Sequence, residues 1–256
     1  MSKWVIMGLR TGIKTTLYPD SAETAAGVTP GRPCGMLGER ATSESSAIPL
    51  CPAGAIRLTE ERISVDYRHC IHCFRCSRRL SEPLDQESGY EWAISLADET
   101  DPSRRLGKPF GRSMHVRILD AGACRACLSE IEQLGKPYYN VHRLGFFITP
   151  TPRHADVLLV AGPVTDNMRL PLQKAYNAMP TPKKVIAVGT CALSGGVFGP
   201  SFTCSAGVAA EIPVDVEIPG CPPPPLALIH GLLVAAGRRA GAVAEPVASI
   251  QGRTME

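Results

Sequence analysis

The spacing of the cysteines constrains this chain more than any other feature of its sequence. Ten cysteines occur in 256 residues, and Cys70, Cys73 and Cys76 form a run with two residues between neighbours. Cys124 and Cys127 repeat the same gap. Residues 1–10 show no long apolar stretch, cleavage site or export signal, so we expect a cytoplasmic chain. In that compartment, clustered cysteines more often bind metal than form disulfides.

Bulk composition argues against two other classes of protein. The formal net charge is only +3, whereas the basic face of a nucleic-acid-binding domain is usually far more pronounced. The longest apolar helix candidate, residues 226–236, falls well short of the ~20 residues that cross a membrane, and it contains His230. We therefore expect no nucleic-acid partner and no direct membrane span.

The run from Cys70 to Cys76 resembles part of the bacterial ferredoxin pattern C-x2-C-x2-C-x3-C-P, whose fourth cysteine ligates the other cluster in two-cluster forms. The fourth position of this run is Leu80, and the upstream run keeps only its own fourth cysteine, Cys51, followed by Pro52. The cysteines for one cluster, three from this run and Cys51, are thus all present. Those for the second cluster of a two-cluster ferredoxin are absent. The pattern predicts one 4Fe–4S cluster, with the ligands Cys51, Cys70, Cys73 and Cys76.

A zinc site is the alternative interpretation of this N-terminal set, because zinc also takes four thiolates, although it usually prefers two separated C-x2-C pairs. Cys34 lies too far upstream for the motif and is expected to be a spare thiol. His69 and His72 are interpreted as exposed loop residues.

From residue 114 onward, strand and helix patterns alternate. Residues 114–119 are a strand candidate, and residues 155–160 form a continuous apolar run, as expected for a strand buried on both faces. Further buried strands are predicted at residues 184–188 and 214–218. Helices are predicted at residues 128–134, 168–179 and 225–236. This alternation is typical of a doubly wound, flavodoxin-like parallel sheet. The predicted fold class is therefore α/β, preceded by a small ferredoxin-like iron–sulfur segment.

Four further cysteines follow the carboxyl ends of predicted strands. Cys124 and Cys127 follow the first strand, Cys191 the third and Cys221 the fourth. Ligands bind at that edge of an open α/β sheet, so these loops can converge on a second 4Fe–4S cluster. The alternative is a set of buried structural thiols, which is common for isolated cysteines. Cys204 follows no strand and is expected to be unligated.

These patterns divide the chain into four parts. Residues 1–82 form the ferredoxin-like 4Fe–4S segment, with short extended pieces at residues 55–58 and 62–65. Residues 83–112 form a polar linker that docks through Tyr90 and Trp92. Residues 113–240 form the α/β 4Fe–4S domain, and residues 241–256 form a C-terminal tail.

The stretch from Asp120 to about Arg238 resembles the small subunit of energy-converting nickel–iron hydrogenases of the formate hydrogenlyase type (group 4). The wider superfamily includes the 20 kDa subunit of respiratory complex I. Residues 12–19 and the N-terminal cysteines resemble the polyferredoxin partner of the same complexes, so the chain looks like a fusion of two subunits. The segments that carry the main resemblance are 124–130, 152–164, 188–198 and 218–223.

The resemblance implies a role for each cysteine set. The C-terminal set, Cys124, Cys127, Cys191 and Cys221, would ligate the cluster nearest the active site of a separate large subunit, which would hold the nickel–iron centre. Electrons would pass between that cluster and the N-terminal one, so the chain would be an oxidoreductase subunit without a catalytic centre of its own. Glu130 falls on the family's acidic position and would support proton transfer or fix the loop; a plain carboxylate near a helix N-terminus is the alternative.

The resemblance also implies partners and a location. The partners are a hydrogenase-type large subunit and other iron–sulfur and membrane subunits, on the cytoplasmic face of the inner membrane. A complex I-like quinone-reducing module is the second hypothesis, but complex I subunits carry adjacent cysteines where this chain has the spaced pair Cys124 and Cys127. A non-catalytic docking subunit that binds zinc is the third.

Overall fold

The computed structural model describes residues 2–25, 27–37, 47–58, 62–79, 84–96 and 112–242. Most of the predicted C-terminal tail, part of the predicted linker and Leu80 lie outside these ranges. Within them, no helix is both long enough and apolar enough to cross a membrane.

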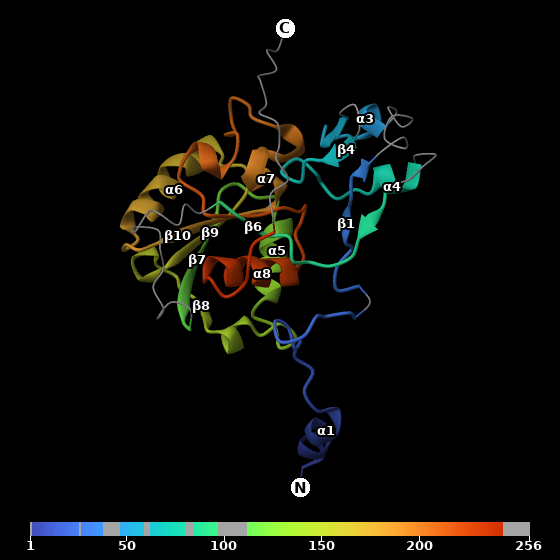
Figure 1. The fold of residues 1–256 in the computed structure, drawn as a ribbon. Coiled ribbons are helices and arrows are strands. Elements are labelled where there is room, and N and C mark those ends of the chain that lie inside the picture. The colour runs from blue at the N-terminus through green and yellow to red at the C-terminus, as the bar shows by residue number, and fades with distance from the viewer. Residues whose placement is uncertain are drawn as a thin grey trace.

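A six-stranded sheet forms the centre of the larger part of the chain (Figure 1). Strands β7 to β11 are parallel to one another, and β6 pairs antiparallel with β11 at one edge of the sheet. Numbered along the chain, the parallel strands have the spatial order 2-1-3-4-5, which is the flavodoxin-like order. The α/β prediction is confirmed. From edge to edge the strands are β6 (Ile94–Ser95), β11 (Val216–Ile218), β10 (Lys184–Val188), β9 (Val157–Ala161), β7 (Met114–Asp120) and β8 (Phe146–Ile148).

Helices cover both faces of this sheet. Along β9, Val157, Leu159 and Ala161 enter one hydrophobic core, which α5 (Ala126–Gln133) and α8 (Pro225–Ala235) share. The alternate residues Leu158 and Val160 enter the other core, with α6 (Asp166–Ala178) and α7 (Gly189–Ser194). Every residue of α8 is buried, as expected for a helix that is apolar on all sides.

The predicted strands and helices of this part lie within two residues of the observed ones. The sequence patterns missed β6, β8 and α7. In β8, Phe147 and Ile148 are exposed, so this three-residue strand has no buried alternation to reveal it. Four 3-10 turns complete this part: η2 (Val141–Leu144), η3 (Pro152–His154), η4 (Gly196–Phe198) and η5 (Val208–Ala210).

A small antiparallel sheet organises the N-terminal cysteine region. Its order is β2 (Met36–Leu37), β4 (Arg62–Val65), β3 (Ile56–Leu58), which confirms the two predicted extended pieces. Ile56, Ile63 and Val65 form a separate core with the buried Cys70. The short helices α3 (Ala47–Leu50) and α4 (Arg75–Arg79) flank it, and β1 (Arg32–Pro33) pairs with β5 (Gln86–Glu87).

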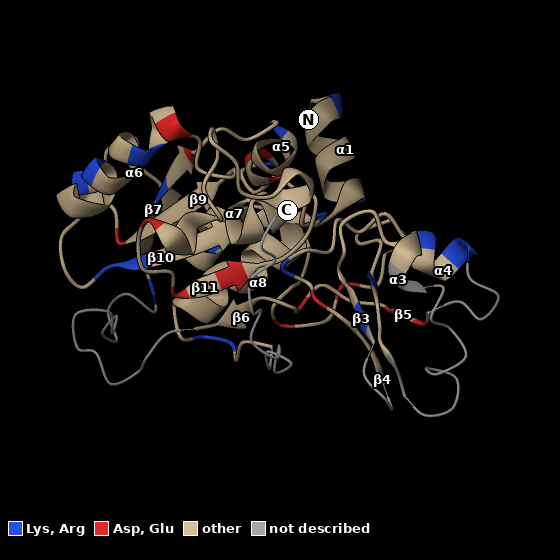
Figure 2. Ribbon diagram, turned by 90° about the horizontal axis from the view of Figure 1, so that it is seen from above, with Lys and Arg blue, Asp and Glu red and all other residues tan. Residues whose placement is uncertain are grey.

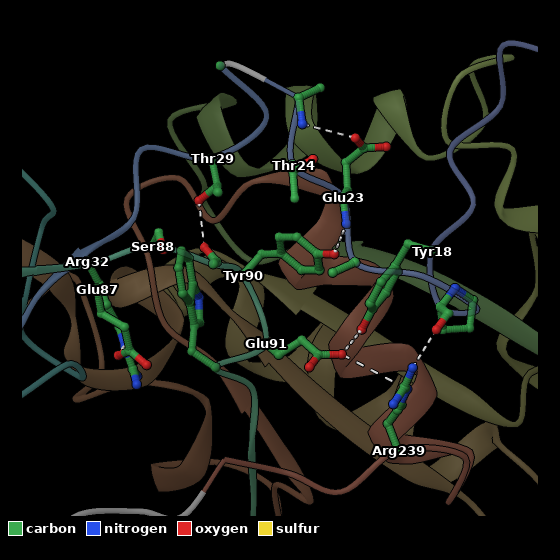
Figure 3. Close-up of a pocket in the computed structure, with 16 residues that line it drawn as sticks. Tyr18, Glu23, Thr24, Thr29, Arg32, Glu87, Ser88, Tyr90, Glu91 and Arg239 are labelled. Carbon is green, nitrogen blue, oxygen red and sulfur yellow. Dashed lines mark hydrogen bonds and ion pairs between the residues drawn. The ribbon is translucent and has the colours of Figure 1, made fainter.

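Residues that precede and follow this region in the sequence pack into the α/β core. Tyr18, Tyr90 and Trp92 are all buried there, as expected for the two linker aromatics. Beside them lies a cavity of about 870 Å³ (Figure 3). In its wall the Tyr18 hydroxyl donates to Glu91 at 2.8 Å, and the Tyr90 hydroxyl accepts the Glu23 N–H at 2.7 Å. The exact division of the chain into domains stays a prediction.

Candidate metal centres

The C-terminal cysteines gather at the carboxyl edge of the central sheet. Cys124 lies in the loop between β7 and α5, and Cys127 lies in the first turn of α5. Cys191 lies in α7, directly after β10, and Cys221 lies three residues after β11. Asp120 shapes the first loop, because its Oδ1 accepts the backbone N–H groups of Gly122 and Ala123 at 2.9 and 2.7 Å.

Two glycines leave room for the sulfurs of this set. A Cβ atom built on Gly189 would lie 2.6 Å from Cys127 Sγ, and one built on Gly196 would lie 2.7 Å from Cys191 Sγ. Both glycines have positive φ, +82° and +72°, a backbone region that residues with a Cβ rarely adopt. Glycine therefore satisfies two conditions here, the turn and the close approach to a thiol.

The thiols of this set are close enough to influence one another. Burial, followed by the neighbouring thiols Cys191, Cys221 and Cys124, raises the pKa of Cys127 to about 12. Burial, and then its neighbours, also raise the pKa of Cys191 and of Cys221. Neighbouring thiols whose pKa values are raised in this way do not ionise together at neutral pH unless a cation lies among them. This donor set fits an iron–sulfur cluster, whose iron would hold all four as thiolates.

The N-terminal cysteines line a second, smaller cavity. Cys51, Cys70, Cys73 and Cys76 share it with apolar side chains, among them Ile56, Val65 and Phe74. The loop that carries the three-cysteine run is tightly wound, since His72 and Phe74 have φ values of 51° and 54°. The backbone N–H of Ala55 donates to Cys51 Sγ at 3.3 Å. A cavity lined by these four cysteines, one of which accepts an N–H···S bond, fits a second cluster.

The electrostatics of this set match those of the first. The pKa of Cys70 is raised to about 12 mainly by burial, which outweighs the lowering by the His72 N–H, and the nearby thiols Cys76, Cys51 and Cys73 add to the rise. Burial also raises the pKa of Cys76. The expectation that His69 and His72 are exposed was wrong. His69 Nδ1 lies 3.0 Å from the buried Asp66 carboxylate, and the half-buried His72 ring packs edge-on against Trp92 at 5.7 Å between centroids.

A buried hydroxyl joins the two cysteine sets. Thr190 precedes Cys191, and its Oγ1 donates to the backbone carbonyl of Cys70 at 2.9 Å, with the Gly220 carbonyl at 3.2 Å. Thr190 is itself fully buried, so this bond is shielded from water. A carbonyl of the N-terminal set is thus held by the residue next to a cysteine of the C-terminal set.

Other contacts fix the same junction, where the β3–β4 region lies beside the central sheet and its helices (Figure 2). Arg68 Nε donates to the buried Glu217 carboxylate at 2.7 Å, and Ser194 Oγ donates to the Arg68 carbonyl at 2.8 Å. Trp92 Nε1 donates to the Pro219 carbonyl at 3.0 Å. The sequence patterns identified none of these contacts, because each joins residues more than 120 positions apart.

The other singled-out residues lie around these sets. Glu130 is half-buried in α5, and burial raises its pKa, so its role in proton transfer stays a prediction. Cys34 lies by Glu87, with 3.9 Å between Sγ and Oε2. Cys204 is near enough to Cys191 to raise that thiol's pKa. Among the described residues, no three His, Cys, Asp or Glu side chains are arranged to hold a single metal ion.

Comparison with known proteins gives one family match. Residues 124–235, which include all four C-terminal cysteines, match the family described as NADH ubiquinone oxidoreductase, 20 Kd subunit. This family is known for a 4Fe–4S cluster.

Three curated proteins are similar over 42% to 59% of this chain. A probable membrane-bound hydrogenase subunit, mbhJ of Pyrococcus furiosus, is 40% identical over 152 residues, which is 59% of this chain and 91% of that protein. Formate hydrogenlyase subunit 7 of Escherichia coli K12 is 42% identical over 132 residues, 52% of each chain, so the match spans about half of that protein. An NADH-quinone oxidoreductase subunit of Clostridium beijerinckii is 47% identical over 108 residues, 42% of this chain and 64% of that one.

Proposed function

Because the chain belongs to the family of the 20 kDa subunit of NADH ubiquinone oxidoreductase, a family of oxidoreductase subunits, we propose that it is the electron-transfer subunit of a membrane-associated nickel–iron hydrogenase complex. In this proposal it relays electrons between a 4Fe–4S cluster on Cys51, Cys70, Cys73 and Cys76 and a second one on Cys124, Cys127, Cys191 and Cys221. The nickel–iron centre belongs to a separate large subunit.

The observation that carries the proposal is the hydrogen bond from Thr190, the residue before Cys191, to the backbone carbonyl of Cys70. This hydrogen bond completes a bonded path for electrons from Cys70 Sγ to Cys191 Sγ. All other steps of the path are covalent bonds of the chain. A bound cluster supplies one-electron redox chemistry at each end. The chain supplies the thiolates, excludes water from the junction and holds the two ends in fixed relation.

The names of two relatives favour a hydrogenase over other oxidoreductases. One is called a membrane-bound hydrogenase subunit and the other a formate hydrogenlyase subunit. The spaced pair Cys124 and Cys127 supports the same choice. The proposed partners are therefore a hydrogenase-type large subunit and further iron–sulfur and membrane subunits, and the proposed location is the cytoplasmic face of the inner membrane.

The experiment that tests this function is native, anaerobic purification of the complex through this chain, followed by metal analysis and a hydrogen assay. We expect nickel near one per complex and hydrogen evolution from a low-potential donor. Iron without nickel and without hydrogen turnover would refute the hydrogenase proposal.

A complex I-like quinone-reducing module is the second candidate, and the 47% identity with an NADH-quinone oxidoreductase subunit favours it. Reoxidation of the reduced complex by a quinone, in a preparation without nickel, would support this function. Zinc in place of iron, with no iron–sulfur absorption, would instead support a structural docking subunit.

A further inference from the structure

The helix α1 (Lys3–Thr11) projects from the body of the protein and buries none of its residues (Figure 1). It lies at the opposite end of the molecule from α3 and α4, which flank the N-terminal cysteines (Figure 1). The chain is attached to the body only after this helix. Thr15 Oγ1 donates to the Pro137 carbonyl at 3.0 Å, the Thr16 N–H donates to the Tyr138 carbonyl at 2.8 Å, and Tyr18 is buried.

Most large side chains of α1 are apolar and exposed. Trp4 is 73% exposed, Leu9 72% and Met7 67%. Ile13 and Leu17, just beyond the helix, are exposed as well. Single exposed apolar residues are ordinary on a protein surface, but a contiguous group on one projecting helix marks an interaction site.

The charges on this segment are all of one sign. Lys3, Arg10 and Lys14 are basic, and no Asp or Glu occurs before Asp20 (Figure 2). Lys3 and Arg10 are seven residues apart, so they lie on the same side of the helix, away from Trp4 and Leu9. A helix with a broad apolar face, a narrow basic stripe and an exposed tryptophan has the chemistry that binds the interface of an anionic bilayer.

We propose that α1 lies in the headgroup region of an anionic lipid bilayer, with Trp4 and Leu9 inserted and Lys3, Arg10 and Lys14 against the lipid phosphates. The charge complementarity favours lipid over an apolar groove on another protein, which would not require three cations. The inference goes beyond the proposed electron relay and does not depend on it, since lipid binding through α1 requires neither cluster.

The test uses the full chain, purified anaerobically, and two kinds of vesicle: phosphatidylcholine alone, and phosphatidylcholine mixed with phosphatidylglycerol. We expect binding to the mixed vesicles and little to the neutral ones. Each cation near such a surface strengthens binding about fivefold, so loss of three cations costs on the order of 100-fold. Reversing all three (K3E, R10E and K14E) should weaken binding by at least that factor, because the new carboxylates are also repelled by the lipid phosphates. Because α1 has no buried residues, these changes should leave the fold intact.

A matched control reverses three exposed basic residues elsewhere, K136E, R153E and K174E, and should leave binding nearly unchanged. Fluorescence gives an independent readout. The chain has two tryptophans, and Trp92 is already buried, so a blue shift on adding mixed vesicles reports Trp4. Trp4→Phe should abolish the shift.

Three results would overturn the proposal. The first is equal binding to both vesicle types, and the second is no binding to the mixed vesicles. The third is binding that persists when Lys3, Arg10 and Lys14 are reversed. If the α1 variants instead lose a protein subunit from the native complex while the purified chain never binds lipid, the helix docks on a protein.

Discussion

Replacing Gly189 by alanine would test the C-terminal centre most directly. The new Cβ would stand 2.6 Å from Cys127 Sγ and 3.3 Å from the Gly220 carbonyl oxygen, in a backbone with φ near +82°. A thiol that is free can rotate away from such a contact, but one that ligates a cluster cannot. The substitution therefore distinguishes a ligand from a spare buried thiol.

The size of the effect follows from two costs. A residue with a Cβ in the left-handed region costs about 1–2 kcal/mol. Forcing a methyl group into a packed site costs a further ~1–3 kcal/mol. Together they reach roughly 2–5 kcal/mol, a large share of the ~5–15 kcal/mol by which a domain is stable, and they act on one cluster loop. We expect Gly189→Ala to lose the C-terminal cluster and retain the N-terminal one.

The assay is iron and acid-labile sulfide per chain, with electron paramagnetic resonance of the reduced protein. Two 4Fe–4S clusters correspond to about eight iron atoms, so the variant should hold about four. Gly237→Ala is the matched control, because Gly237 also has positive φ, +68°, but nothing lies within 4 Å of its added Cβ. A full iron content in Gly189→Ala, or equal losses in both variants, would refute the assignment of Cys127 as a ligand.

Three further predictions concern the N-terminal set and the junction. Cys51→Ser should remove about half of the iron and leave the C-terminal cluster spectrum, whereas unchanged iron would contradict the ligand assignment. Thr190→Val should leave the buried Cys70 carbonyl without its donor and lower the free energy of unfolding by ~1–3 kcal/mol, while Thr190→Ser should retain most of it; equal losses in denaturant titrations would count against the hydrogen bond. Burial raises the pKa of Glu217, with Arg68 opposing, so above the ordinary glutamate pKa of about 4.3 the folded state binds more protons than the unfolded state and stability falls as pH rises. We therefore expect the difference in unfolding free energy, wild type minus Glu217→Gln, to decrease with rising pH until the pKa of Glu217 in the folded state is passed. An increase in this difference would show that folding lowers the pKa of Glu217 instead of raising it.

The sequence by itself determined the α/β part of the fold. Strands β9 and β10 are buried almost along their whole length, so apolar runs were sufficient to find them, and α8 was found because it is apolar along its whole length. The alternation of strands with helices predicted a parallel, doubly wound sheet. The edge strands β6 and β8 carry no comparable pattern, because two or three residues at a sheet edge are defined by their neighbour's hydrogen bonds.

The sequence also determined which cysteines form each candidate set, since spacing and position after a strand are local properties. The structure brings each set together as the spacing predicts, and its role as a cluster ligand stays a prediction. The sequence alone could not show why position 189 must be glycine. The sulfur that occupies the place of a Cβ atom there belongs to Cys127, which lies on another strand–helix unit.

Only the tertiary structure decided how the two sets are related. Thr190 and Cys70 are 120 residues apart, and no sequence periodicity links positions at that separation. Arg68 and Glu217 meet in the same way, a half-exposed cation on a buried carboxylate. Local patterns report which face of an element is buried, whereas a hydrogen bond between distant loops depends on how the completed units pack. The candidate cysteine sets can therefore be identified from the sequence, whereas the junction between them exists only in the folded chain.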